Sequence, residues 1–368
     1  MRQLKSILLP TDFRLASIAA SRIAAQIAET FGARVIVLHV VDSKPCSLDV
    51  LPYLLDNGRT LLRRFEKEAA LEHMNISDAS VAHGSPAERI LRKAEEIDAD
   101  LILMGAGEPT YGEPFAMGPV AEAVTQHARQ PVLAVRPERQ LGSFQRILCP
   151  VDCSPVSRRA LNNAIRLARA FQGRLIVKTV IPDPIHVAAV KEAAAVLDAQ
   201  HERAWRSHFE EFLEGLDFAD VERAVDVRRG VPHRQIVAAA REHDCDLIVM
   251  GATGRTGLLR LLMGTVTRRV LQDLPCSILT VHDEDVLLES LQEDDVRTNN
   301  LLYVEAESLL KAGVLEAALA KFDQVLACNP FHVPALEGRA QACDRLGQAE
   351  RAARCRQRAE VLRHETWV

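Results

Sequence analysis

Residues 1–282 alternate between short apolar runs and longer stretches in which apolar residues recur every three or four positions. The runs rich in β-branched residues, such as 33–42 and 174–183, predict strands. The periodic stretches, such as 15–31 and 155–171, predict amphipathic helices that each end near a glycine. Because strand and helix alternate throughout, the pattern predicts α/β domains with parallel, doubly wound, Rossmann-like sheets.

The same plan occurs twice in this region. The run SILLPTDF near the start of the chain matches RILCPVDC, and each places an aspartate, Asp12 or Asp152, after the first strand. Further on, DADLILMG returns as DCDLIVMG, 146 positions later. The repeat predicts two tandem domains, residues 1–140 and 141–283. We expect them to pack about a pseudo-twofold axis through their last strands.

The rest of the chain has a different pattern. An acidic segment, 284–298, is interpreted as a linker, and helical spacing resumes over 299–368. Gly313 and Gly347 stand 34 positions apart with small residues at matching places after them, which is typical of tetratricopeptide repeats. Such a pair of repeats either holds a partner peptide or is a plain helical hairpin without a binding role. The expected helices lie near 299–311, 315–327, 333–345 and 349–364.

Composition indicates the cellular compartment of the chain and argues against several classes of partner. Its 368 residues carry a formal net charge of −5, which does not favour general nucleic-acid binding. No apolar run reaches the length of a membrane span, and the first residues lack the layout of a signal peptide. The eight cysteines form no Cys-x-x-Cys pair, which indicates reduced thiols in a cytoplasm. Cys149 and Cys153 are too few to hold a metal by themselves.

The most informative stretch connects a predicted strand to a predicted helix. Gly251 ends the apolar run 247–250, Gly254 and Gly264 follow, and a helical pattern begins at Thr265. Glycines leave backbone N–H groups accessible, and a helix amino end carries partial positive charge, so this stretch suits a phosphate chain. It is neither a Walker A loop nor a dinucleotide fingerprint, because the lysine of the first and the glycine spacing of the second are missing. The alternative is a tight turn without a ligand.

Other residues in or near this stretch are candidates for contact with the same ligand. Arg255 and Arg260 lie inside it, where they either contact phosphate or remain solvated. If the first and fourth strands of the domain are neighbours, Asp152 and Gly251 meet at a topological switch point, where such sheets bind ligands. Asp152 then orients a ribose or an adenine edge, or instead serves as the cap of the following helix.

Together these residues resemble the universal stress proteins, in tandem, over about residues 1–282. The family motif Gly-x2-Gly-x9-Gly-[Ser/Thr] is met by the glycine stretch and Thr265. The resemblance implies a cytoplasmic stress-response or regulatory protein that binds ATP, with Mg²⁺ as a potential companion ion. With Arg255 added for its charge, the implied nucleotide contacts are Asp152, Val180, Gly251, Gly254, Arg255, Gly264, Thr265 and Val266.

The first copy departs from the motif. Its aligned residues are Gly105, Glu108, Gly118 and Pro119. Glu108 brings negative charge towards the phosphates, and Pro119 removes a hydroxyl and a backbone N–H donor. We therefore expect one ATP per chain, in the second domain, with a weak or empty site in the first domain and Asp12 as its relic.

The sequence favours binding over catalysis. No catalytic arrangement, Walker-type lysine or carboxylate cluster for Mg²⁺ is recognisable, so at most slow ATP hydrolysis is expected. His186, His201 and His208 share a helical stretch with Trp205, but a zinc site needs further ligands, so packing or exposure is favoured. The main alternative function is a non-catalytic scaffold or adaptor that binds a protein partner through residues 299–368. A nucleotidyl-transfer enzyme ranks last, and a homodimer is compatible with the sequence.

Overall fold

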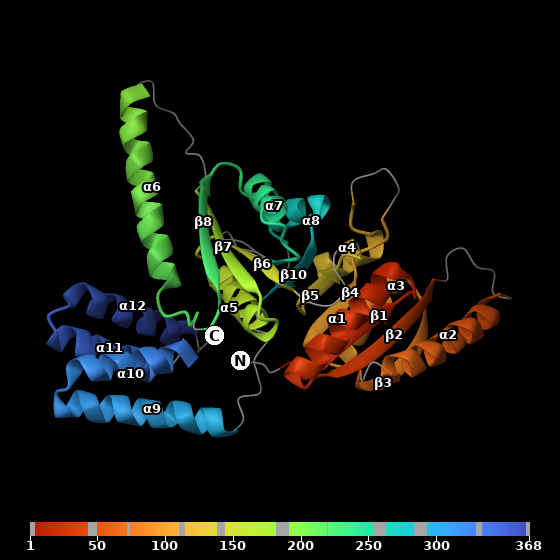
Figure 1. Cartoon of the computed structure of the whole chain (residues 1–368), viewed down its shortest axis with the longest axis horizontal. Helices are drawn as coiled ribbons and strands as arrows, with labels where there is room; N and C mark the ends of the chain where they lie inside the picture. Colours follow the sequence, from red (N-terminus) through yellow and green to blue (C-terminus); the bar gives the residue numbers. More distant parts are fainter. Residues whose placement is uncertain are drawn as a thin grey trace. The chain divides into compact units, whose positions relative to one another are not determined.

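The computed structural model of the chain divides into two compact units (Figure 1). The first comprises Met1–Phe212 and Asp220–Ser290, and the second comprises Leu213–Ala219 and Leu291–Val368. The structure describes residues 4–42, 50–71, 74–109, 115–137, 144–181, 191–218, 220–252, 263–282, 293–328 and 333–365.

Strand and helix alternate through the first unit, which confirms the predicted α/β fold. The elements of its first half are β1 (Ser6–Thr11), α1 (Leu15–Phe31), β2 (Arg34–Asp42), α2 (Leu51–Leu71), β3 (Ile76–Gly84), α3 (Pro86–Glu96), β4 (Leu101–Gly105), α4 (Pro119–His127) and β5 (Val132–Val135). Those of its second half are β6 (Arg146–Val151), α5 (Pro155–Ala170), β7 (Arg174–Ile181), α6 (Lys191–Leu213), β8 (Arg223–Arg229), α7 (Pro232–Glu242), β9 (Leu247–Gly251), α8 (Thr265–Asp273) and β10 (Ser277–Val281). Every residue of β1 and of β10 is buried, as expected for strands covered on both faces.

Within the described residues, ten strands form one sheet in the order β3-β2-β1-β4-β5-β10-β9-β6-β7-β8. The first and fourth strands of each half are parallel neighbours, β1 with β4 and β6 with β9, which confirms the expected switch point. The halves join where β5 and β10 pair antiparallel. Leu133 faces Leu279 in this pairing, and the two are equivalent positions of the repeat. The pseudo-twofold axis expected through the last strands therefore passes between them.

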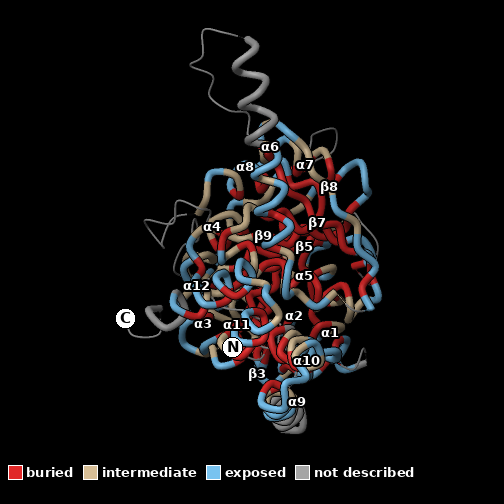
Figure 2. Tube along the Cα trace, turned by 90° about the vertical axis from the view of Figure 1, so that its left-hand side faces the viewer, coloured by how far each residue is buried: buried red, intermediate tan, exposed pale blue. Residues whose placement is uncertain are grey.

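Helices cover both faces of the sheet because right-handed crossovers in opposite directions leave their helices on opposite faces. In the first half, α3 and α4 pack on the strands around buried residues such as Ile90, Val124 and Ile102. In the second half, α7 and α8 form the matching apolar cluster, which extends to Phe115 and Ala134 of the first half. Figure 2 shows the buried residues concentrated along the strands. The two halves therefore share a continuous core.

The second unit is helical, which confirms the predicted helical tail. Its helices are α9 (Glu293–Ala312), α10 (Leu315–Cys328), α11 (Val333–Arg345) and α12 (Ala349–Glu365). The start of α9 lies inside the segment interpreted as a linker, and its acidic residues 293–295 suit a helix amino end. Among the residues described, no helix combines the length and apolar character needed to cross a membrane.

Glycines shape the packing of this unit. Gly313 and Gly347 have φ of 81° and 75° and follow α9 and α11, where a left-handed residue ends a helix. Gly338 of α11 faces Phe322 of α10 so closely that a Cβ would lie 2.3 Å from the ring. Consecutive helices pack against one another, as in a helical repeat. Its assignment as a tetratricopeptide pair stays a prediction.

Candidate functional site

The carboxyl ends of β6, β7 and β9 meet at one edge of the sheet. Asp152 follows β6, Val180 lies near the end of β7, and Gly251 ends β9. Because β6 lies between β7 and β9, these three predicted residues come together at the switch point. The Ile181 carbonyl accepts a hydrogen bond from Gly230 on the β8 side at 3.1 Å. Since backbone groups alternate along a strand, those of Val180 face β6 and the turn after it.

Asp152 lies in a tight turn that leads into α5. Its Oδ1 accepts a hydrogen bond from the Ser154 amide at 3.1 Å, and Cys153 between them has a left-handed φ of 64°. Ser154 is the cap of α5, with its Oγ accepting from the Ser157 amide at 3.2 Å. The cap considered for Asp152 is therefore provided by Ser154, and the turn fixes the Asp152 carboxylate just after β6, the strand between β7 and β9.

The two ends of the glycine stretch are tied together. The Gly264 amide donates to the Ala252 carbonyl at 2.8 Å, and Thr267 Oγ1 donates to the Gly251 carbonyl at 2.9 Å. Gly264 is the N-cap of α8, with φ −60° and ψ 145°, and as a glycine it supplies no side-chain cap to the first-turn amides. The amino end of α8 therefore presents backbone donors next to the switch point.

Of the remaining predicted residues, only two lie in the described part of the chain. Thr265 and Val266 are the first two residues of α8, the former exposed and the latter half-buried. Gly254, Arg255 and Arg260 fall within 253–262, outside the described residues, so their contacts with a ligand stay predictions.

The equivalent loop of the first half is closed in the same way, but one of its side chains binds the amino end of α1. The Gly118 amide donates to the Ala106 carbonyl at 2.7 Å. Glu108 directs its side chain to α1, where its Oε1 accepts from the Ala16 amide at 3.0 Å. A close approach explains this contact, because a Cβ on Gly105 would lie 2.6 Å from the Ala16 backbone. A carboxylate of the chain itself therefore binds the amino end of α1.

The first half has the same aspartate turn as the second half but lacks a backbone N–H donor at the start of α4. Asp12 Oδ1 accepts from the Arg14 amide at 3.0 Å and from Ser17 Oγ at 2.8 Å, in a turn like that of Asp152. Pro119 is the first residue of α4, a position that proline suits, but it has no N–H to offer an anion.

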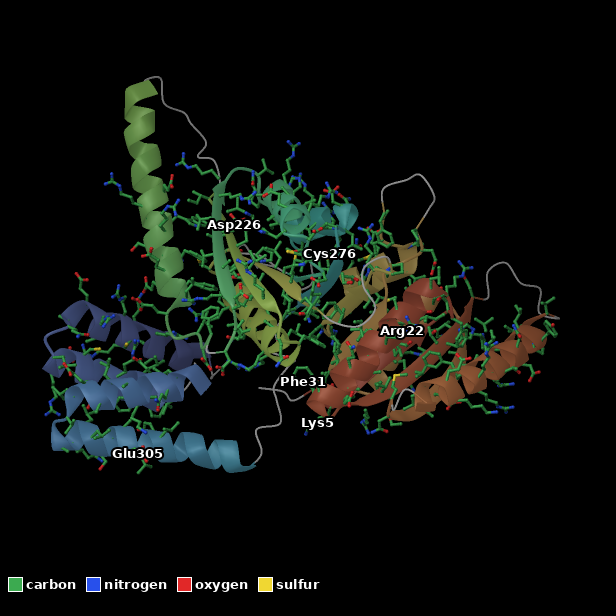
Figure 3. The ribbon with its side chains drawn as sticks, in the orientation of Figure 1. Lys5, Arg22, Phe31, Asp226, Cys276 and Glu305 are labelled. Atoms are coloured by element: carbon green, nitrogen blue, oxygen red, sulfur yellow. The ribbon has the colours of Figure 1, made fainter. Side chains whose placement is uncertain are left out.

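The second half also contains a buried ion pair that was not predicted from the sequence. Lys178 of β7 has no exposed surface, and its Nζ donates to Asp226 Oδ2 of β8 at 2.8 Å. Figure 3 labels Asp226. Arg228 Nε donates to Asp226 Oδ1 at 2.9 Å. The equivalent strand pair of the first half has Leu38 opposite Ser80. The available signal was the single lysine inside the apolar run of β7.

Burial and pairing act against each other in this pair. Burial lowers the pKa of Lys178, and the Asp226 carboxylate opposes that effect. Burial raises the pKa of Asp226, but the hydrogen bonds from Lys178 and Arg228 leave it below its ordinary value. The Asp226 carboxylate therefore favours the charged form of Lys178, and the Lys178 ammonium favours the charged form of Asp226.

The metal alternatives gain no support from the geometry. Burial raises the pKa of the Cys149 thiol in β6, as suits a packed side chain. Over the described part of the chain, no group of three His, Cys, Asp or Glu side chains could hold a metal ion. His208 is exposed on α6, whereas His186 and the side chain of His201 lie outside the described structure.

Comparison with known proteins accords with the repeat and the fold. The model of the universal stress protein family matches residues 3–136 and again 143–282. A universal stress protein of Methanocaldococcus jannaschii is 32% identical over 142 residues, which cover 38% of this chain and 82% of that protein. A putative universal stress protein structure from Pseudomonas aeruginosa has a TM-score of 0.58 at 19% identity, covering 77% of this chain and 95% of that one. Another from Archaeoglobus fulgidus has a TM-score of 0.53 at 20% identity, covering 76% and 98%.

Proposed function

Because this chain belongs to the universal stress protein family, we propose that it is a regulatory protein that binds ATP in its second domain. ATP enters alone or as its magnesium complex. Asp152 and the backbone of Val180 hold the adenosine, while the stretch from Gly251 to Gly264 and the amino end of α8 hold the phosphates. The proposal places the protein in the cytoplasm, where ATP is plentiful.

The observation that carries this proposal is the difference between the two equivalent loops. In the first domain, the Glu108 carboxylate lies on the Ala16 amide at 3.0 Å, so the chain supplies its own anion to a helix end. In the second domain, the matching position is Gly254, which has no side chain to do so. The first-turn amides of α8, next to that switch point, follow an N-cap glycine without a side chain, so they suit an anion from outside, and a triphosphate has the right charge.

The other residues suit a nucleoside next to that anion. Adenine offers both an amino donor and ring-nitrogen acceptors along one edge, which a backbone amide and carbonyl can match. Val180 directs its backbone groups toward the end of β6. Asp152, fixed by its bond to Ser154, is a suitable acceptor for a ribose hydroxyl.

The regulatory role follows from binding free energy. A ligand present at 100 times its Kd stabilises the state that binds it by about 2.7 kcal/mol. That is enough to change which surfaces the second domain presents to a partner or to a second copy of the chain. We assign no catalytic residue, and the proposal includes at most slow hydrolysis.

Calorimetric titration with ATP tests the proposal, using paired variants of the two domains. Asp152→Asn keeps an Oδ1 acceptor for the Ser154 amide but removes the charge, and Asp12→Asn makes the same change in the first domain. We expect the wild type to bind one ATP per chain. The Kd of ATP should rise at least about tenfold in Asp152→Asn and should stay unchanged in Asp12→Asn. Equal effects of the two variants, or no binding by the wild type, would overturn the proposal.

A second pair of variants tests the phosphate end. Thr265→Pro copies the residue that the first domain has at the first position of α4, so the helix should tolerate it. It removes one hydroxyl and one N–H donor from the amino end of α8. We expect weaker ATP binding with little change in stability, whereas Pro119→Thr alone leaves ATP binding unchanged.

The helical tail supports a second candidate, in which the protein is a scaffold that binds a partner through residues 299–368. Val304 of α9 and Val314 after it are 61% and 50% exposed, so this unit has apolar side chains at its surface. Thermal unfolding distinguishes the two candidates, because ATP raises the melting temperature of the first unit only if the nucleotide binds there.

A further inference from the structure

Arg136 follows β5 and reaches across the antiparallel join between the two domains. Its amide donates to Ser277 Oγ at 3.0 Å. Its Nη1 donates to the carbonyls of Leu274 and Pro275, at 3.0 and 3.1 Å. Leu274 is the C-cap of α8, so this first-domain cation lies at the carboxyl end of that helix. A cation at this end binds the last carbonyls and complements the helix dipole.

The same guanidinium packs on the loop of its own domain. Its Cζ lies 4.4 Å from the centroid of the Phe115 ring, within the range of a cation–π contact. Phe115 is 7% exposed and belongs to the apolar cluster that includes Val270 and Leu271 of α8. Arg136 and Phe115, which we call the Arg136 brace, therefore link the β4–α4 connection of the first domain to α8 of the second.

The two domains do not have equivalent versions of this brace. At the equivalent positions of the repeat, His282 stands for Arg136, and Pro131 stands for Ser277. A proline has no hydroxyl to accept the backbone bond, and an imidazole lacks the fork of a guanidinium. The fold is symmetric about Leu133 and Leu279, but these contacts favour the domain that keeps the glycine motif.

We propose that Arg136 is a positioning residue for the second-domain site. It holds α8 at its carboxyl end and thereby sets where Gly264 and the first-turn amides stand. This helix has nine residues, so a shift at one end reaches the other. The degenerate first domain therefore contributes to an ATP site that it does not form itself, and this part of the inference rests on the proposed function.

The test compares three variants of the full chain. Arg136→Met keeps the length of the side chain and removes the cation and both carbonyl bonds, whereas Arg136→Lys keeps the charge. Arg129→Met is the matched control, because Arg129 is an exposed first-domain arginine that pairs with Glu95 of α3. Hydrogen exchange of residues 264–276 is measured without ligand, and the Kd of ATP is measured by calorimetry.

We expect faster exchange over 264–276 in Arg136→Met, with partial rescue in Arg136→Lys and no change in Arg129→Met. We expect the Kd of ATP to rise roughly three- to tenfold in Arg136→Met, again with partial rescue by lysine. In the wild type, ATP should also slow exchange over 115–127 of the first domain, and Arg136→Met should abolish that remote effect.

The two proposals fail separately. If the wild type does not bind ATP, the proposed function is overturned. Hydrogen exchange over 264–276 without ligand then tests by itself whether Arg136 holds α8. Unchanged exchange over 264–276 in Arg136→Met overturns the brace. Unchanged ATP affinity, or faster exchange spread over the whole first unit, overturns the positioning role and leaves a general structural one.

Discussion

The carboxylate of Glu108 accepts a hydrogen bond from the amide of Ala16, a residue 92 positions earlier in the chain. The N-cap residue of α1, Arg14, gives this helix no side-chain cap. Glu108 therefore acts as a tertiary cap, with its charge at the positive end of the helix dipole. Under the proposed function, the same charge would also repel a phosphate, so Glu108 would both stabilise α1 and weaken a nucleotide site in the first domain.

The capping role of Glu108 predicts a loss of stability on substitution. Glu108→Gln keeps an acceptor and loses the charge, so we expect a decrease in unfolding free energy of about 0.3–1 kcal/mol. Glu108→Ala also loses the acceptor and should cost about 1 kcal/mol or more. Urea unfolding measures both, with Glu96→Gln on the surface of α3 as control. A Glu108→Ala variant as stable as the wild type contradicts the capping role.

The same residue predicts a gain of function. Glu108→Gly together with Pro119→Thr restores the family motif in the first domain, where the Asp12 turn is already in place. We expect the stoichiometry of ATP binding to rise from one to two per chain, which calorimetry measures directly. Glu108→Gly alone should give a weaker second site, because Pro119 still lacks its N–H donor. If the double variant binds one ATP as before, the first site is lost for another reason.

Local patterns were sufficient for the type and the order of the elements along the chain, although α9 begins inside the segment interpreted as a linker. The apolar run before Gly251 and the helical spacing after Thr265 each concern neighbouring residues, and both appear as β9 and α8. The pairing of β5 with β10 followed from the repeat, because equivalent last strands meet on a twofold axis.

The contacts that distinguish the two domains could not be predicted in this way. The charge of Glu108 was evident, but its target, Ala16, depends on how closely α1 approaches Gly105 in the folded sheet. The partners of Arg136 lie 138 and 139 positions away, across a strand pairing that no local signal specifies. Such contacts depend on tertiary geometry, whereas propensity and periodicity are local.

The buried pair of Lys178 and Asp226 predicts an asymmetric response to mutation. Asp226→Ala leaves the Lys178 ammonium buried without this carboxylate, and we expect a loss of about 3–5 kcal/mol. The double variant Lys178→Leu and Asp226→Ser copies the Leu38 and Ser80 pair of the first domain. It should recover most of that stability, since an apolar replacement of a buried ion pair is often neutral. A double variant as unstable as Asp226→Ala would show that the charges have a further role.

The pKa shifts of this pair predict the pH dependence of stability. Burial raises the pKa of Asp226, but the bonds from Lys178 and Arg228 hold it below 3.8, its ordinary value. A depressed carboxyl pKa contributes stability that is present above the unfolded pKa and is lost as pH falls through the folded pKa. For Lys178, whose pKa is lowered by burial from 10.5, stability instead rises as pH increases from the folded pKa toward that value. Urea unfolding of the wild type, compared with the Leu and Ser double variant, should show both slopes in the wild type alone.

The contact between Gly338 and Phe322 predicts how the helical unit responds to one methyl group. An alanine Cβ at position 338 would lie 2.3 Å from the ring of Phe322, which is fully buried, so the ring or α11 must shift. We expect Gly338→Ala to cost about 1–3 kcal/mol, a typical penalty for overpacking. Because the helices belong to a separate compact unit, hydrogen exchange over 315–345 reports on that unit by itself. Phe322→Leu removes the end of the ring, so the double variant should be more stable than the sum of the single effects indicates. Additive effects would mean that the two residues do not constrain each other and that another contact sets the spacing of α10 and α11.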